Sequence, residues 1–303
     1  MPSLKPTSVL RRLLSAPTWM PVLLVALGLT AGATARAESA VTPTPFGGAA
    51  INDAGPDYDF SFNASFSADG SRVYFSRAKK DWSKIAVFSA DRLGDGWSVA
   101  RPVVLGDGSS RDTDPLVSPS GGLLYFASDR AVPGQTAPSS GYHIWVARKE
   151  GFRWSAPELL GGDVDGALYP SVTTNGDLYF MRQQGTGTAL FHAVLKAGVA
   201  VDVQPLHIAG ADAGQDETVS RDNHVFAFVA PDPAGGKAIF VAYHSKQGWS
   251  TPDKLALGAG IHNPFALGLS PDGGTLYFTA SQAGATAPQI FSAPVPPEPA
   301  VAG

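Results

Sequence analysis

Cysteine is absent from the 303-residue sequence. The chain therefore has no disulfide, no thiol nucleophile and no thiolate ligand for a metal. Amphipathic segments of helix length are missing as well, whereas proline and glycine are abundant, with 25 and 34 residues. Stability must then come from apolar surface that is buried on strands, and the length suits one all-β domain.

Only one long apolar run is present, and it lies near the N-terminus. Three basic residues precede the apolar residues 19–33, and Ala35-Arg-Ala37 follows as an A-x-A cleavage site. This order predicts a secretory signal peptide over residues 1–37 rather than a membrane anchor, because the run is short and ends in Gly and Ala. We therefore expect a periplasmic or secreted protein without a membrane span.

Basic residues are in the minority. Cleavage after residue 37 would remove four of the 22 basic residues and no acidic one, which leaves 18 against 26 and a formal charge of −8. Nucleic acids and anionic membrane surfaces are bound through basic patches, so the charge argues against both as partners. We expect instead a monomer that binds a protein or peptide of the cell envelope, preferably a basic one.

A short stretch, Ser270-Pro-Asp-Gly-Gly-Thr-Leu-Tyr-Phe278, places a tight-turn signal directly before an apolar run. The same arrangement recurs four times, at residues 67–75, 118–126, 173–180 and 220–228. Successive copies end in phenylalanines that lie 51, 54, 48 and 50 residues apart. A period in this range is typical of a repeat architecture.

Each repeat divides into four short strands. The turn joins the first two strands, an aliphatic column marks the third, and a Trp-Ser-x-Pro or similar segment marks the fourth. The column consists of Ile85, Ile144, Leu190, Ile239 and Ile290. Four strands per repeat predict a five-bladed β-propeller over residues 38–295, with six blades as the alternative, followed by a Pro-rich disordered tail at 296–303.

The fifth repeat lacks its fourth strand, because Pro-rich sequence follows Ile290 directly. Residues 38–48 can be aligned with the end of the second repeat. We therefore predict that residues of about 41–46 supply the outer strand of blade five. This strand would close the ring and remove an exposed sheet edge.

The pieces Asp114-Pro115, Ser270-Pro-Asp-Gly273 and Tyr125-Phe-Ala-Ser-Asp-Arg130 resemble the WD-like propeller repeat of the TolB family. The resemblance covers residues 41–294. It implies a periplasmic protein that acts through protein binding at the mouth of its propeller. The chain differs from TolB in two respects. TolB has a separate α/β domain before its propeller, whereas here the propeller sequence is expected to start almost at the predicted cleavage site, and five repeats are found instead of six.

Acidic residues gather in the loops that lead from one repeat into the next. Counting back from each turn places Asn63, Asp114, Tyr169 and Asp216 at equivalent positions of the first strands, with Asn263 or Ala266 in blade five. We predict a ligand-binding channel mouth formed by Asn63, Asp112, Asp114, Tyr169, Asp216, Glu217, His262 and Asn263. The carboxylates could instead cap loop amides and keep the protein soluble.

A negatively charged mouth would suit a basic peptide, a protein or a divalent cation such as calcium. Asp112-Thr-Asp114 and Asp163-Val-Asp165 alternate as calcium ligands do, but neither is a complete calcium loop. The six histidines fall at different strand positions, which speaks against a shared metal site. The sequence therefore predicts no cofactor, with a divalent cation as the alternative.

Catalysis is the competing interpretation. Propeller glycosidases place two carboxyl groups about 5 to 9.5 Å apart in the channel, and Asp114 with Asp216 or Glu217 would be the candidates. No glycosidase motif surrounds these acids, and a Gly-x-Ser-x-Gly elbow is absent. We expect a non-catalytic binding scaffold, with a glycoside hydrolase or carbohydrate-binding protein as the alternative. Trp97, Trp154 and Trp249 recur at one place in the repeat, which favours packing between blades over sugar binding.

Overall fold

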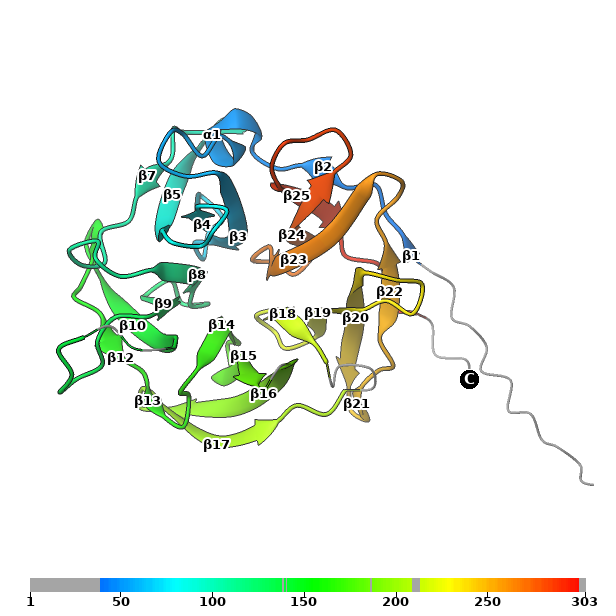
Figure 1. The fold of residues 1–303 in the computed structure, drawn as a ribbon. Coiled ribbons are helices and arrows are strands. Elements are labelled where there is room, and N and C mark those ends of the chain that lie inside the picture. The colour runs from blue at the N-terminus through cyan, green and yellow to red at the C-terminus, as the bar shows by residue number, and fades with distance from the viewer. Residues whose placement is uncertain (1–38, 138, 140, 186, 209–212, 300–303) are drawn as a thin grey trace, which may run out of the picture. The chain divides into compact units, whose positions relative to one another are not determined.

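Five antiparallel sheets surround a common axis in the computed structural model (Figure 1). It describes residues 39–137, 139, 141–185, 187–208 and 213–299. The predicted signal peptide and residues 300–303 of the predicted tail lie outside the described residues. In the part of the chain that is described, no helix has the length and apolarity required to cross a membrane.

The strands of the first three blades follow the repeats. Blade one contains β3 (Phe60–Phe66), β4 (Arg72–Ala78), β5 (Ile85–Leu93), β6 (Gly96–Trp97) and β7 (Arg101–Pro102). Blade two contains β8 (Asp112–Val117), β9 (Leu123–Ser128), β10 (His143–Glu150), β11 (Arg153–Trp154) and β12 (Glu158–Leu159). Blade three contains β14 (Ala167–Val172), β15 (Asp177–Gln184), β16 (Gly187–Lys196) and β17 (Val199–Pro205), and β13 (Gly161–Gly162) pairs with β17 in parallel.

The last two blades include strands from the N-terminal segment. Blade four contains β18 (Gln215–Val219), β19 (Val225–Pro231), β20 (Lys237–Ser245), β21 (Gly248–Trp249) and β22 (Asp253–Ala256), and β1 (Ser39–Ala40) pairs with β22 in parallel. Blade five contains β23 (Ile261–Leu269), β24 (Thr275–Gln282), β25 (Gln289–Pro294) and β2 (Thr44–Pro45). The short helix α1 (Gly48–Asn52) follows β2.

The ring closes between its two ends, as the sequence predicts. Thr44 of β2 lies opposite Ser292 of β25, and the amide of Phe46 donates to the carbonyl of Ile290 at 2.8 Å. The Phe46 ring then packs edge-on against Tyr277, with 4.8 Å between ring centroids. The five-bladed prediction is confirmed, and the six-bladed alternative is wrong because the missing strand of blade five comes from the N-terminal segment.

Buried columns connect the blades. The phenylalanines that end the repeats are fully buried, and all five residues of the aliphatic column are at most 4% exposed. The tryptophans of the fourth strands pack against the preceding blade, because the ring of Trp154 lies 6.0 Å from Tyr74 and that of Trp249 lies 6.3 Å from Tyr179. These aromatic side chains therefore join neighbouring blades, in agreement with the packing interpretation.

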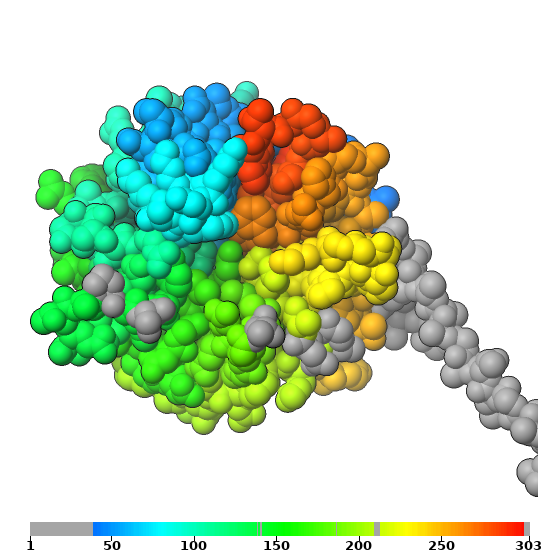
Figure 2. All heavy atoms as spheres, viewed as in Figure 1, coloured from blue at the N-terminus to red at the C-terminus, as the bar shows by residue number. Residues whose placement is uncertain are grey.

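Two faces result from the alternation of strand direction. The five tight turns lie on one face, here called the turn face, and each has a left-handed residue: Gly70, Gly121, Gly176, Asn223 and Gly273. The first strands begin at the opposite face, here called the mouth face. On the face seen in Figure 2, atoms of neighbouring blades meet at the centre.

Candidate functional site at the propeller axis

A β-bulge interrupts the first strand of every blade at the same place. The residue at the bulge has left-handed backbone geometry in all five blades, with φ values of 56° for Asn63, 53° for Asp114, 52° for Tyr169, 55° for Asp216 and 52° for Ala266. Ala266 is therefore the fifth equivalent residue. Asn263, the other candidate, also has a φ of 52° but belongs to a second irregularity near the start of β23.

Left-handed geometry is unfavourable for residues with a Cβ, least so for Asn and Asp. Tyr169 and Ala266 adopt it nevertheless, so the surrounding structure must compensate. The compensation lies in hydrogen bonds from their backbone amides. The amide of Tyr169 donates to Oδ2 of Asp114 at 3.4 Å, and the amide of Ala266 donates to Oδ2 of Asp216 at 3.3 Å.

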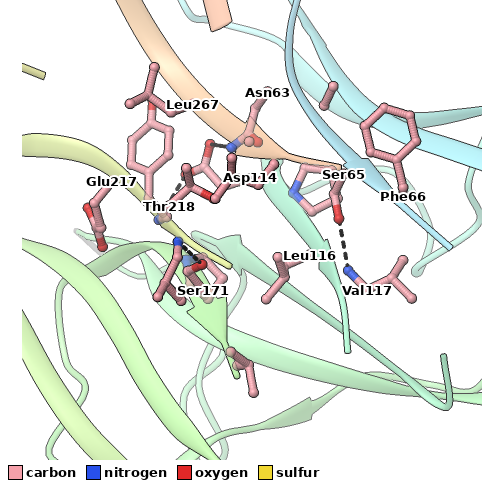
Figure 3. Close-up of a pocket in the computed structure, with 18 of the residues that line it drawn as sticks. Asn63, Ser65, Phe66, Asp114, Leu116, Val117, Ser171, Glu217, Thr218 and Leu267 are labelled. Carbon is pink, nitrogen blue, oxygen red and sulfur yellow. Dashed lines mark hydrogen bonds between the residues drawn. The ribbon is translucent and has the colours of Figure 1, made fainter. Parts of the chain in front are cut away.

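The two axial aspartates thus join blades. Asp114 of blade two also accepts from the side-chain amide of Asn63 in blade one, at 3.2 Å (Figure 3). Its own neighbour Thr113 donates to the same oxygen at 3.0 Å. Gln215 donates to Asp216 at 3.0 Å. Both carboxyl groups are therefore engaged as acceptors within the protein.

Serine hydroxyls make the complementary connections. The amide of Val117 donates to the Ser65 hydroxyl at 3.1 Å, and that of Val219 donates to the Ser171 hydroxyl at 2.9 Å. Blade five meets blade one by close backbone contact, because a Cβ at Gly268 would lie 2.0 Å from the carbonyl oxygen of Ala64. Aspartate, serine and glycine contacts together connect each pair of adjacent first strands.

Burial controls the ionisation of this cluster. Asp114 and Glu217 are each 2% exposed, and Asp216 is 5% exposed. Burial raises the pKa of Asp114 to about 7, although its hydrogen bonds act in the opposite direction. Burial also raises the pKa of Asp216, and that of Glu217 rises well above its usual value. Asp114 is thus only partly ionised at neutral pH.

Glu217 differs from its equivalents in the other blades, which are Ala64, Pro115, Pro170 and Leu267. Neither carboxyl oxygen of Glu217 has a hydrogen-bond partner among the described residues. Burial is the main cause of its raised pKa, and the nearby Asp216 and Asp114 add to it. Burial, together with the same carboxyl groups, also raises the pKa of the Tyr169 hydroxyl.

A small cavity lies between the first strands, with Asn63, Asp114 and Glu217 among the residues of its wall (Figure 3). Its volume is about 30 Å³, which holds a few water molecules at most. The axial cavity is therefore too small for a sugar ring.

Towards the turn face, the Arg221 guanidinium of blade four reaches blade one and donates to the carbonyls of Phe66, Ser67 and Ala68 at 3.0 to 3.2 Å.

Many of the loop acids at the mouth face have cationic partners. Asp112 pairs with Arg130 at 2.6 Å, and Asp163 pairs with Arg182 at 3.4 Å. The pKa of Asp112 is nevertheless raised, mainly because the side chain is buried. These arginines are not among the residues predicted for the site. Their signal was present, since an arginine closely follows the repeat phenylalanine in both Phe126-Ala-Ser-Asp-Arg130 and Phe180-Met-Arg182.

The arginines also lie over aromatic rings. The guanidinium carbon of Arg130 is 5.0 Å from the Phe126 ring centroid, and that of Arg182 is 4.7 Å from the Phe191 centroid. Arg77 of blade one stands 4.6 Å from the Phe88 centroid. Cation–π contacts fix all three side chains, ion pairs add to this for Arg130 and Arg182, and the arginines offset part of the negative charge at the mouth face.

His262 and Asn263 lie apart from the axial cluster. Both are exposed near the start of β23, where His262 lies opposite Ser281 of β24. The structure therefore brings five of the eight candidate residues together at the axis, places Asp112 in an ion pair, and leaves His262 and Asn263 on the mouth face. Among the described residues, no group of three or more histidine or carboxylate side chains is arranged to hold a metal ion.

A groove that is more open than the axial cavity lies on the mouth face, at the rim of the ring. This groove, of about 430 Å³, separates residues 52–59, which lead into blade one, from residues 284–289 of blade five. Asp53 and Asp59 line this rim groove, and no cationic side chain does. Oδ1 of Asp59 lies 3.8 Å from Nζ of Lys79, a residue that does not line the groove. The rim groove thus combines accessible volume with two carboxylates.

Comparison with known proteins identifies the fold. No protein-family model and no curated protein matches the sequence. The catalytic domain of a GH62 α-L-arabinofuranosidase from Coprinopsis cinerea is similar in structure, with a TM-score of 0.57, 11% identity, and coverage of 84% of this chain and 96% of that one. A putative TolB from Agrobacterium tumefaciens is also similar, with a TM-score of 0.50, 14% identity, and coverage of 76% and 73%.

TolB from Acinetobacter baumannii matches with a TM-score of 0.48 and 13% identity, over 78% of this chain. The chain covers 55% of that TolB, which is little more than half of its length. At these identities the likeness concerns the fold alone. The fold is shared by a putative TolB and by α-L-arabinofuranosidases, so function has to be argued from the site.

Proposed function

We propose that this chain is an exported, TolB-like propeller with WD-like repeats that acts as a non-catalytic scaffold in the periplasm or outside the cell. Its partner would be a protein of the cell envelope that presents a basic segment to the mouth face. The rim groove carries this proposal, because it offers about 430 Å³ and two carboxylates without a cation in its lining. A lysine or arginine side chain could enter it and meet Asp53 or Asp59.

The axial cluster supports the non-catalytic part of the proposal. Glycoside hydrolysis needs two carboxyl groups that flank a bound sugar. Asp114 and Asp216 are instead engaged by backbone amides of the next blade, and the space beside Asp114 is about 30 Å³. Their geometry suits a structural role in which a carboxyl group joins adjacent blades.

Binding to defined peptides tests the proposal. We expect a fluorescein-labelled decapeptide of alternating lysine and alanine to bind the purified protein in a salt-dependent manner, and the glutamate counterpart not to bind. The double variant Asp53→Asn/Asp59→Asn should weaken lysine-peptide binding at least fivefold. The control Asp95→Asn/Asp202→Asn removes the same charge from two exposed sites elsewhere. Equal losses in both variants, or equal binding of both peptides, would refute a specific basic site.

A glycoside hydrolase is the second candidate, and one observation favours it. Asp114 has a pKa of about 7 and lies near the buried Asp216 and Glu217, so one carboxyl group could be protonated while another is ionised. The test is release of nitrophenol from an aryl α-L-arabinofuranoside. Activity that disappears in Asp114→Asn, with folding retained, would establish hydrolysis and overturn the scaffold proposal.

A further inference from the structure

Large apolar side chains are exposed on blades one and two to an unusual degree. Phe152, at the tip of the β10–β11 hairpin, is 99% exposed, and Val104, which follows β7, is 77% exposed. Leu93 and Val99 of blade one are 63% and 81% exposed. Single exposed apolar residues need no explanation, but a cluster beside a groove is typical of a docking surface.

Such a groove runs along the boundary of these two blades. One part, of about 570 Å³, has Arg72, Tyr74, Val104, Phe152, Arg153 and Trp154 in its lining. A second part, of about 350 Å³, has Asp69, Tyr74, Lys149 and Trp154 in its lining. The two parts share Tyr74 and Trp154 and are here called the interblade groove.

The floor of the interblade groove is preformed. Tyr74 is 4% exposed, and its ring meets Trp154 edge to face, with 6.0 Å between centroids and 65° between planes. Both residues belong to strands that are fixed by their sheets. An apolar side chain could rest on this pair between Phe152 and Val104 without reorganisation of the backbone, which lowers the entropic cost of binding.

The net charge of the groove lining has the sign opposite to that of the whole protein, since it holds three cations and one carboxylate, Asp69. The larger part contains Arg72 and Arg153 and no carboxylate, and the smaller part adds Lys149. The carboxylate of Asp69 accepts hydrogen bonds from the hydroxyls of Ser67 and Ser71 at 2.6 and 2.8 Å. Arg72 is held by Asp91 at 2.6 Å, which leaves Arg153 and Lys149 as the exposed cations of the groove.

We propose that the interblade groove binds an extended segment of a partner protein in which a large apolar side chain is flanked by carboxylates. The apolar side chain lies on Tyr74 and Trp154 between Phe152 and Val104. The carboxylates meet Arg153, which lines the larger part of the groove, and Lys149, which lines the smaller part. This surface is separate from the rim groove and prefers a ligand of opposite charge, so it does not depend on the function proposed for the mouth face.

A library of random dodecapeptides displayed on phage tests this inference, with selection on the purified protein and depletion on Phe152→Ser/Val104→Ser. Both substituted residues are exposed, so the variant should fold normally. We expect selected peptides to share an aromatic or large aliphatic residue with acidic neighbours. Their affinity, measured by fluorescence anisotropy, should fall at least tenfold in the depletion variant and about threefold or more in Arg153→Gln/Lys149→Gln.

The matched control is Leu93→Ser/Val99→Ser, which removes two similarly exposed apolar side chains of blade one from outside the groove lining. It should bind the selected peptides as the unchanged protein does. Three results would overturn the inference: no peptide enriched by the depletion step, enriched peptides without acidic residues, or equal loss of affinity in the control. The Asp53→Asn/Asp59→Asn variant should retain these peptides, so failure at the rim groove can be distinguished from failure here.

Discussion

Oδ2 of Asp114 accepts the backbone amide of Tyr169, one blade further along the ring, at 3.4 Å. Asp216 repeats this contact with Ala266 at 3.3 Å. Asp114 and Asp216, which the sequence predicts to bind an external partner, thus accept hydrogen bonds from the protein's own backbone. The acidic character of the axis follows from the assembly of blades, since the left-handed residues Tyr169 and Ala266 present their amides to the aspartates of the preceding blades.

Stability should depend on pH through this cluster. The pKa of Asp114 is about 7 in the folded protein and near 4 when unfolded, so the folded state binds more protons between these values and loses stability as pH rises. Asp216 and Glu217 act in the same direction, because their pKa values are also raised. We expect the free energy of unfolding, measured with urea, to decrease from pH 5 to pH 8.

Asp114→Asn removes one of these titrations and retains a residue that tolerates left-handed geometry. Between pH 5 and pH 8, the free energy of unfolding of the variant should rise by about 2 to 4 kcal/mol relative to that of the unchanged protein, since one pKa unit corresponds to about 1.4 kcal/mol. Asp95→Asn, at an exposed position, is the control and should leave the pH profile unaltered. Parallel profiles for all three proteins would show that Asp114 does not titrate in this range.

Gly268→Ala should weaken the packing of blade five against blade one. The added Cβ would lie 2.0 Å from the carbonyl oxygen of Ala64, which belongs to the backbone and has little freedom to move. We expect a loss of about 3 kcal/mol or more in unfolding free energy. Gly96→Ala, where the nearest atom is 3.8 Å away, should change stability by about 0.5 kcal/mol or less. Similar urea midpoints for both variants would contradict the close-approach argument.

Arg221→Met should weaken the turn face. Three carbonyl oxygens of blade one lose their donor, while the apolar stem of the side chain is approximately preserved. Since Arg221 is partly exposed, water can replace some of these contacts, and we expect a loss of about 1 to 3 kcal/mol. Amide hydrogen exchange should quicken in the 67–72 turn. Unchanged exchange there would mean that Arg221 does not hold the two blades together.

The sequence predicts the propeller because its repeats carry both turn chemistry and buried columns, and each signal lies within one blade. Closure by residues 41–46 is also predicted, because the missing strand leaves a gap in the repeat. The parallel pairs of β1 with β22 and of β13 with β17 are missed, since each rests on two residues without a characteristic pattern. Short-range sequence signals do not reveal contacts between blades.

The same limit applies to the candidate site. Asn63, Asp114, Tyr169 and Asp216 align from their spacing to the turn, and the structure places them around one axis. The engagement of Asp114 and Asp216 with amides of the next blade depends on the bulge geometry, which no residue type specifies. Arg130 and Arg182 are recognisable from the repeat, but their pairing with Asp112 and Asp163 becomes evident only when loops and strand ends meet in space.

Phe46 should secure the ring closure. Its ring contacts Tyr277 and Phe66, at centroid distances of 4.8 and 5.8 Å, and Trp97 at 5.6 Å, so it joins blade five to blade one. Phe46→Ala should cost about 2 to 3 kcal/mol of unfolding free energy, at the lower end for a buried phenylalanine because the side chain is partly exposed. Phe152→Ala removes a fully exposed ring and should be neutral within about 0.5 kcal/mol. If both variants unfold at the same urea concentration as the unchanged protein, the closure depends on the β2–β25 hydrogen bonds and not on this aromatic cluster.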